Sequence, residues 1–287
     1  MDGIFLINKE KGSTSRDVVN KIVKKLGIKK VGHTGTLDPI ATGVLVICVG
    51  KATKVVDLLT SLEKEYIAEV MLGIKTDTLD ITGNIVSDQI VDISVNDVER
   101  VLKSFIGKYS QEVPIYSAVK IKGKKLYEYA RNNEEVLLPK REVNIKNIEL
   151  ISDIYYVNNH PCFKFKCTVS KGTYIRSLIK DICEKLNVNG TMLNLTRTRQ
   201  GQFYLEDCIL VDDVDKEKMI KIQDVLNIEK VYVDEFLFNK IKNGQILENR
   251  YKSDLVMFIY NDKLLAIYKI YDRDNSKMKP YKMFGGI

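Results

Sequence analysis

An aspartate in a turn-forming loop is the residue of this 287-residue sequence that most strongly suggests chemistry. Asp38 follows a polar, glycine-spaced segment, and Pro39 fixes the chain directly after the carboxylate. The apolar, β-branched run 43–49 is typical of a buried strand. The loop would therefore hold the reactive carboxylate oxygen next to a rigid element of the fold. A plain Asp-Pro turn without chemistry is the ordinary alternative.

Two other side chains could act with this carboxylate. Tyr66 begins an alternating apolar segment that predicts a strand, where a tyrosine is most often a packing residue. Arg176 falls in the first turn of a helix predicted over 174–186, after a turn at 170–172. An arginine there could pair bidentately with a carboxylate or a phosphate, and a surface arginine is the ordinary alternative.

These residues lie in motifs that follow one another in a recognisable order. The stretch 31–53, VGHTGTLDPIATGVLVICVGKAT, strongly resembles the catalytic motif of the bacterial tRNA pseudouridine-55 synthases. It is followed by Lys-x-Tyr at 64–66, VPIYSAVKIKGKKLYEYAR at 113–131 and SKGTYIRSLIKDICEKL at 170–186. The resemblance extends over residues 1–210 and departs at Glu10, where the family usually has a proline.

The resemblance implies the isomerisation of uridine 55 in the TΨC arm of tRNA to pseudouridine, without a cofactor. Asp38 would be the catalytic carboxylate, Tyr66 would pack on the target base, and Arg176 would pair with Asp38. A carboxylate can act as a nucleophile on the sugar or the base, or stabilise a cationic sugar, and the sequence does not choose between these routes. The target base must be extruded from a folded loop.

The same resemblance assigns four residues to substrate binding. His33 is a candidate for helping the extrusion, although a histidine of the core is the alternative. Lys9 lies in a turn that braces the catalytic loop, Tyr174 begins the helix of Arg176, and Leu195 is the candidate for an apolar contact with the target nucleotide. Leu195 is expected to point away from Arg197 on its predicted strand.

Basic and aromatic residues interleave within residues 108–141. Between Lys120 and Arg141 there are seven basic residues and three acids. Such a segment can pair with phosphates and stack on bases, whereas a solvated, lysine-rich helix and hairpin is the alternative. The resemblance favours an insertion that closes over the tRNA stem-loop. Its predicted RNA-binding residues are Lys120, Lys122, Lys124, Lys125, Arg131 and Arg141.

The elements that must position these residues predict an α+β fold. Strands are predicted over 3–8, 43–49, 66–72, 143–151 and 163–170, and helices over 16–26, 52–62, 92–107 and 174–186. Ser13 or Ser15 is predicted to cap the first helix, and Gly27 to end it. The family fold is a mixed, largely antiparallel sheet flanked by helices.

The C-terminal part of the sequence has a different pattern. Residues 206–228 are predicted to connect through a helix, followed by a short helix ending in Gly244 and two strands joined at Asn261 and Asp262. The pattern resembles a small, β-rich RNA-binding PUA module, and an extension of the catalytic sheet is the alternative. We therefore predict a catalytic domain over 1–228, with the insertion at about 108–141, and a PUA-like domain over 229–287.

The composition limits the other possibilities. A net charge of +7 is compatible with a polyanionic partner. Two histidines and no CxxC argue against a zinc site, and five scattered cysteines suit reduced thiols. No apolar run approaches the roughly 20 residues of a membrane span, and no signal-peptide pattern is present, so a cytoplasmic protein, expected to be a monomer, is predicted.

Two other classes of protein compete with this interpretation. An RNA-binding protein without catalysis would need only the basic segment and the C-terminal module, but not Asp38, Tyr66 and Arg176 together. A carboxylate-dependent hydrolase would normally need a second carboxylate, and none with a comparable context accompanies Asp38.

Overall fold

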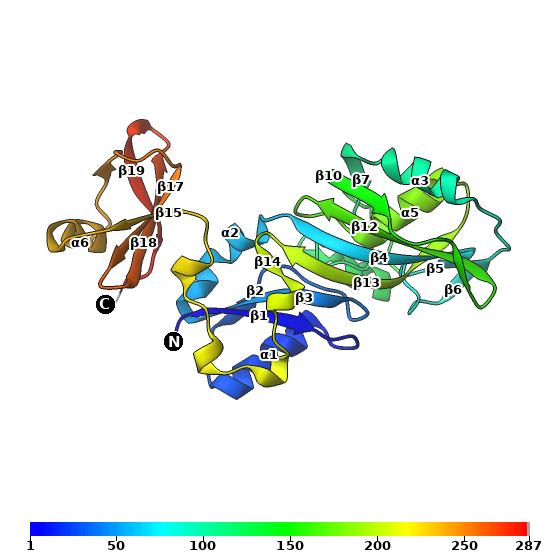
Figure 1. Cartoon of the computed structure of the whole chain (residues 1–287), viewed down its shortest axis with the longest axis horizontal. Helices are drawn as coiled ribbons and strands as arrows, with labels where there is room; N and C mark the ends of the chain where they lie inside the picture. The colour runs from blue at the N-terminus through cyan, green and yellow to red at the C-terminus, as the bar shows by residue number, and fades with distance from the viewer. Residues whose placement is uncertain (286–287) are drawn as a thin grey trace.

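A ten-stranded mixed sheet forms the centre of the computed structural model, which describes residues 1–285 (Figure 1). Its main strands follow the order β1-β3-β13-β4-β12-β10-β7, while β2, β11 and β14 pair at its margins. Within the described residues every pairing in this sheet is antiparallel except a short parallel one between β3 and β13. The strands are β1 (Gly3–Lys9), β2 (Val31–His33), β3 (Thr42–Val49), β4 (Lys64–Leu72), β7 (Gly107–Glu112), β10 (Lys140–Leu150), β11 (Tyr155–Val157), β12 (His160–Val169), β13 (Gly190–Gln200) and β14 (Phe203–Tyr204).

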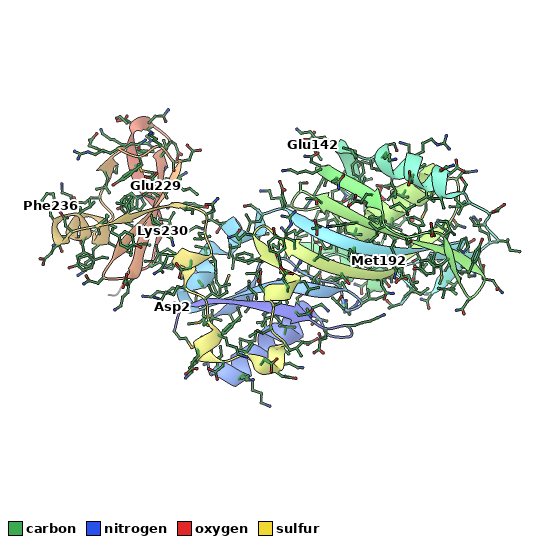
Figure 2. The ribbon with its side chains drawn as sticks, in the orientation of Figure 1. Asp2, Glu142, Met192, Glu229, Lys230 and Phe236 are labelled. Atoms are coloured by element: carbon green, nitrogen blue, oxygen red, sulfur yellow. The ribbon has the colours of Figure 1, made fainter. Side chains whose placement is uncertain are left out.

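Three amphipathic helices bury their apolar faces in one hydrophobic cluster with the sheet. They are α1 (Ser15–Leu26), α3 (Val95–Lys103) and α5 (Ile175–Lys185). Met192 of β13 is fully buried in this cluster and is labelled in Figure 2. The predicted α+β class, with a largely antiparallel sheet, is confirmed.

The start of α1 differs from the prediction. Thr14, rather than Ser13 or Ser15, is the N-cap, because its backbone is extended and its hydroxyl accepts from the Asp17 N–H in a capping box. The buried Ser15 hydroxyl instead bonds the Leu37 backbone, where it accepts from the N–H at 2.9 Å. The helix is thereby tied to the loop that carries Asp38.

Two predicted helices are mostly 3-10 turns. Residues 50–60 form η1 (Gly50–Val55) and a five-residue α2 (Val56–Thr60). The connection 206–228 contains no α-helix, and its short turns are η2 (Leu205–Asp207), η3 (Val211–Asp213), η4 (Lys216–Lys218) and η5 (Ile222–Asp224). Apolar residues of this connection, such as Val211 and Ile222, are buried, so hydrophobicity alone did not distinguish a helix from an extended segment packed on the sheet.

Two smaller hairpins lie beside the main sheet. The hairpin of β5 (Ile74–Thr76) and β6 (Ile85–Asp88) follows β4. The basic insertion runs between the paired strands β7 and β10 and contains β8 (Lys120–Ile121), β9 (Lys124–Lys125) and α4 (Leu126–Arg131).

The C-terminal residues form a separate five-stranded sheet, in the order β15-β17-β18-β19-β16. This arrangement excludes an extension of the catalytic sheet. The predicted hairpin at Asn261 and Asp262 is present, and both residues have positive φ. The elements are β15 (Glu229–Tyr232), α6 (Glu235–Lys242), β16 (Leu247–Glu248), β17 (Leu255–Tyr260), β18 (Lys263–Tyr271) and β19 (Asp274–Met283).

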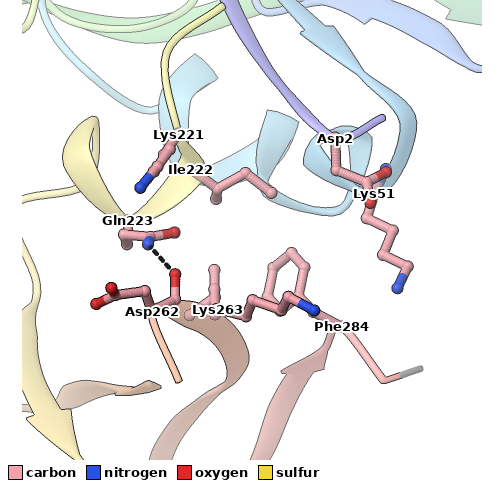
Figure 3. A pocket seen from close by; sticks show the side chains of 9 residues that line it. Asp2, Lys51, Lys221, Ile222, Gln223, Asp262, Lys263 and Phe284 are labelled. Carbon is pink, nitrogen blue, oxygen red and sulfur yellow. Dashed lines mark hydrogen bonds between the residues drawn. The ribbon is translucent and has the colours of Figure 1, made fainter. Parts of the chain in front are cut away.

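The C-terminal sheet meets the rest of the chain at η1, α2 and η5, where Lys51, Asp57 and Gln223 form hydrogen bonds with residues of the C-terminal part (Figure 1). Met257, Ile267 and Phe284 belong to the same hydrophobic cluster as Ile4 and Val44. A cavity of about 370 Å³ lies at this junction, and across it the Gln223 side chain donates to the Asp262 carbonyl at 2.9 Å (Figure 3). Beside it the Asp57 carboxylate accepts from the Tyr281 hydroxyl and the Lys282 ammonium, each at 2.8 Å. No helix within residues 1–285 has the length and apolar character needed to cross a membrane.

Candidate active site

A cavity of about 420 Å³ opens where the Asp38 loop, β4, β13, the start of α5 and the insertion meet. Among the described residues Asp38 is the only acidic one that lines it, and three cationic side chains line it as well: Lys64, Arg176 and Arg197. All three residues that we predicted to be catalytic, Asp38, Tyr66 and Arg176, line this one space although they are far apart in the sequence.

Asp38 and Arg176 form a bidentate ion pair. The Arg176 Nε donates to one Asp38 carboxylate oxygen at 2.8 Å, and the Nη2 donates to the other at 3.1 Å. Arg176 is buried and also donates to the backbone carbonyls of Thr78 and Tyr116, both at 3.0 Å. The guanidinium is therefore held by three segments, and the paired geometry fixes the plane of the carboxylate.

Lys9 holds the Asp38 loop from behind. It is fully buried, and its ammonium donates to the carbonyls of Ser13 at 2.7 Å, Glu10 at 3.0 Å and Pro39 at 3.4 Å. Burial lowers the pKa of Lys9 to about 8. Lys9, predicted to bind substrate, is enclosed and does not line the cavity, and its hydrogen bonds brace the Asp38 loop.

Tyr66 and Leu195 provide the apolar floor of the cavity. Both are buried, on β4 and β13 respectively. Tyr174, predicted to bind substrate, also lines the cavity, at the N-cap of α5. The buried Gln111 fixes its backbone by accepting from the Tyr174 N–H at 2.8 Å and donating to the carbonyl at 3.1 Å, and burial raises the pKa of the Tyr174 phenol.

Arg197 shares a face of β13 with Leu195, contrary to our expectation that they would point in opposite directions. Residues two apart on a regular strand lie on the same face, and the bulges of β13 fall outside the segment 194–197. Arg197 is 1 % exposed, and it donates to the carbonyls of Val44 at 2.6 Å and Gly35 at 3.1 Å. The period of two was sufficient to place Arg197 in the cavity.

Lys64 is a second cavity residue to which the sequence analysis gave no role. It is 6 % exposed, and its ammonium donates to the carbonyls of Thr60 at 2.6 Å and Leu62 at 2.7 Å. Burial, with the nearby charge of Arg197 and then Lys171, lowers the pKa of Lys64 to about 8. Its spacing of two residues from Tyr66 was the available signal.

His33 lies at the end of β2, half-buried and outside the cavity lining. Its Nδ1 accepts from the Gly35 N–H at 3.4 Å. Burial, followed by the charges of Arg197 and Arg16, lowers the pKa of His33 and favours the neutral imidazole. The structure thus places it at the root of the Asp38 loop.

The insertion closes the opposite side of the cavity through Tyr116, Ser117, Ala118 and Tyr127. Two of the predicted RNA-binding residues flank Tyr127: the Lys125 ammonium donates to its hydroxyl at 3.0 Å, and the Arg131 guanidinium lies 5.2 Å from its ring centre. Lys124 pairs with Glu134. The remaining three are exposed and do not line the cavity: Lys120, Lys122 and Arg141.

In residues 1–285 no group of three or more His, Cys, Asp and Glu side chains is arranged to hold a metal ion. The cavity brings together one oriented carboxylate, four tyrosines and three cations. These groups suit a polyanionic substrate with a planar base.

Comparison with solved structures defines the class of the fold. A structure described as an H/ACA RNP bound to a substrate RNA containing 2′-deoxyuridine matches with a TM-score of 0.71 and 24% identity, over 99% of this chain and 85% of the other. The Cbf5 chain of a Cbf5-Nop10-Gar1 complex matches with a TM-score of 0.70 and 26% identity, over 99% and 84%. The fold is that of a pseudouridine synthase with a C-terminal β module.

Sequence comparison identifies the family. Residues 23–175 match the model of the TruB family pseudouridylate synthase, N-terminal domain. The chain is 42% identical to a tRNA pseudouridine synthase B of Bacillus cereus over 99% of this chain and 97% of the relative, and 42% identical to that of Bacillus subtilis over the same shares. The chain belongs to the TruB family of pseudouridylate synthases, and it is an isomerase.

Proposed function

We propose that this enzyme converts uridine 55 in the T arm of tRNA to pseudouridine. The bidentate pair of Asp38 and Arg176 in a cavity floored by Tyr66 and Leu195 carries the proposal. Two further observations support it: the relatives of 42% identity are named tRNA pseudouridine synthase B, and the Asp38 stretch resembles the motif of the pseudouridine-55 enzymes.

In the proposed reaction the extruded uracil enters the cavity between Tyr66 and the Asp38 carboxylate. Arg176 orients the carboxylate toward the nucleotide, so that little rearrangement is needed when charge develops on the sugar or base. Tyr66 and Leu195 pack on the base, and His33 helps its extrusion from the root of the loop. Tyr174 forms part of the cavity wall beside the start of α5.

The proposed reaction is an isomerisation in which all atoms are retained. The bond between N1 and C1′ breaks, the uracil turns, and a bond between C5 and C1′ forms. The proton of C5 is released, and N1 takes up a proton. Because uridine and pseudouridine have the same composition and oxidation state, the reaction balances without an added reductant or oxidant.

We also propose a division of labour along the chain. Residues 1–228 form the catalytic domain, the insertion at about 108–141 holds the T stem-loop over the cavity, and residues 229–287 act as a PUA-like RNA-binding domain. The basic residues of the insertion would contact phosphates, and the enzyme would act as a monomer.

The test is incubation of the purified protein with an unmodified tRNA transcript, without added cofactor, followed by site-resolved detection of pseudouridine. We expect product at position 55 with the native protein and with an Asp92→Asn control, whose carboxylate is exposed and outside the cavity. Asp38→Asn should abolish product and retain tRNA binding.

Other outcomes would overturn the proposal. Tight binding without pseudouridine would favour an RNA-binding protein without catalysis. Product at another position would reject the assignment to uridine 55, and product from Asp38→Asn would reject the role of the carboxylate.

A further inference from the structure

Two of the three cations in the active cavity have no carboxylate partner. Arg176 is paired with Asp38, whereas Lys64 and Arg197 bond only backbone carbonyls. Within residues 1–285 no carboxylate oxygen lies within 4 Å of the Lys64 ammonium or the Arg197 guanidinium. Both residues are nevertheless almost completely buried, at 6 % and 1 % exposed.

A buried cation without a counter-charge is costly, and proteins usually pair such groups. The carbonyl partners satisfy donors but carry no net negative charge. The Lys64 ammonium has three protons, and the carbonyls of Thr60 and Leu62 accept two of them. The lowered pKa of Lys64 is a further sign of an uncompensated charge.

The two cations lie on adjacent strands beside the catalytic loop. Tyr66 and Arg197 are direct cross-strand partners, and Lys64 is two residues from Tyr66 on the same face. Gly35 lies next to both: a Cβ there would lie 3.4 Å from the Arg197 Nη1 and 3.8 Å from the Lys64 Cε. The absence of a side chain at Gly35 leaves its backbone close to these charges.

We infer that Lys64 and Arg197 form a phosphate subsite that receives one of the two RNA phosphates flanking the extruded uridine. The uracil and the ribose are neutral, so a phosphate is the anionic group that the target nucleotide can bring into the cavity. Lys64 supplies a hydrogen bond to the phosphate, and Arg197 supplies mainly charge because its guanidinium is held by carbonyls. This inference rests on the proposed function.

The subsite would also explain why the two cations lie inside the cavity near Asp38 and not on the surface around its opening. A phosphate reaches them only when its nucleotide leaves the loop of the RNA, so their attraction favours the extruded state. Binding energy gained in this way offsets part of the unstacking cost of extrusion.

The experiment combines a change in the RNA with a change in the protein. A T-arm stem-loop RNA is made with all phosphates, or with one uncharged methylphosphonate on the 5′ or the 3′ side of the target uridine, the two stereoisomers being assayed separately. Single-turnover rates and equilibrium affinities are measured for the native enzyme, Lys64→Met and Lys64→Arg. The control is Lys146→Met, which alters an exposed lysine paired with Glu63.

We expect a neutral linkage on one side to slow the native enzyme and the Lys146→Met control about 10-fold or more, as for loss of a charge-assisted hydrogen bond. Lys64→Met should be slow with all-phosphate RNA and should show a clearly smaller fold-loss than the native enzyme with that methylphosphonate, because it has already lost the hydrogen bond to the phosphate and keeps only the charge of Arg197. Lys64→Arg should retain sensitivity to the neutral linkage.

Two results would overturn the inference. One is a native enzyme that is insensitive to a neutral linkage on either side, a measurement that requires no folded variant. The other is an equal fold-loss in native and Lys64→Met enzymes. Formation of pseudouridine in all-phosphate RNA by the native enzyme tests the proposed function separately. If no pseudouridine forms, the affinities of the native enzyme and Lys64→Met for the all-phosphate and methylphosphonate RNAs still test the subsite.

Discussion

The two sides of the active cavity are held in place in different ways. On one side Tyr66, Leu195 and Arg176 are buried and come from β4, β13 and α5, whose apolar residues belong to the main hydrophobic cluster. On the other side the insertion has two-residue strands and a six-residue helix, and Leu126 is the one fully buried apolar side chain in its segment 115–139.

This difference in packing suits different roles for the two sides of the cavity. Groups that act on the nucleotide need a fixed geometry, which dense packing provides. A segment with few buried apolar contacts opens at low free energy, which suits the proposed role of the insertion as a wall that admits a folded RNA. Arg176 links the two sides, since it holds Asp38 on one side and the Tyr116 carbonyl on the other.

Of the changes on the sheet side of the cavity, Arg176→Lys should slow the reaction most. A lysine cannot reproduce the bidentate pair with Asp38, so the single-turnover rate should fall on the order of 100- to 1000-fold, with little change in tRNA affinity. Arg100→Lys, an exposed helix pair with Asp97, should retain the native rate. An equal loss of affinity and rate would contradict a role confined to the chemistry.

Matched leucine truncations should distinguish the stability of the two sides. Leu178→Ala in α5 removes a fully buried side chain from the main cluster and should lower the free energy of global unfolding by about 2–5 kcal/mol. Leu126→Ala should instead increase hydrogen exchange within 115–139, with a smaller change in the melting temperature. Equal shifts in melting temperature would show that the insertion unfolds together with the sheet.

Tyr127→Ala should affect the insertion side alone. Removing an aromatic ring that lines the cavity between two cationic side chains should weaken binding of the stem-loop RNA about 10-fold, by loss of a stacking surface. The rate at saturating RNA should stay within about 3-fold of the native value, because the hydrogen bonds that hold Asp38 and Arg176 do not involve Tyr127. Tyr204→Ala, an exposed tyrosine outside the cavity, is the control.

The smallest expected effect is a pH dependence from Lys64. Its folded pKa is about 8 and its ordinary value is 10.5, so between these values the unfolded state binds more protons and stability rises with pH. The stability of Lys64→Met relative to the native protein should therefore fall by at most about 1.4 kcal/mol per pH unit above pH 8. Urea unfolding at pH 7.5, 8.5 and 9.5 measures this slope, and a constant difference would reject the lowered pKa.

Local sequence patterns predicted much of the fold and the residues around Asp38. The apolar run 43–49, the glycine at 27 that ends the first helix and the turn at Asn261 are local patterns, and each is present in the structure. The second part of the predicted 52–62 helix is a short α2, whereas the first part is a 3-10 turn, because tertiary packing of Ala52 and Val55 decides that conformation.

The features that were missed depend on partners distant in the sequence. Arg197 bonds carbonyls more than 150 positions away, and the strand β19 is mixed in composition and contains Pro280 in its interior. No short-range sequence pattern predicts these long-range hydrogen bonds and strand pairings. The two-residue period of a strand was nevertheless sufficient to predict that Arg197 and Leu195 share a face. The prediction that they point in opposite directions was therefore an error of interpretation.

The position of β13 has a consequence for synthesis of the chain. β13 lies between β3 and β4, although both neighbours precede it by more than 100 residues. During translation the exposed edges of β3 and β4 therefore remain unpaired on this side until residue 200 has left the ribosome. Such late, long-range closure favours slow folding and leaves strand edges open to aggregation, so we expect nascent chains ending before β13 to depend most on chaperones.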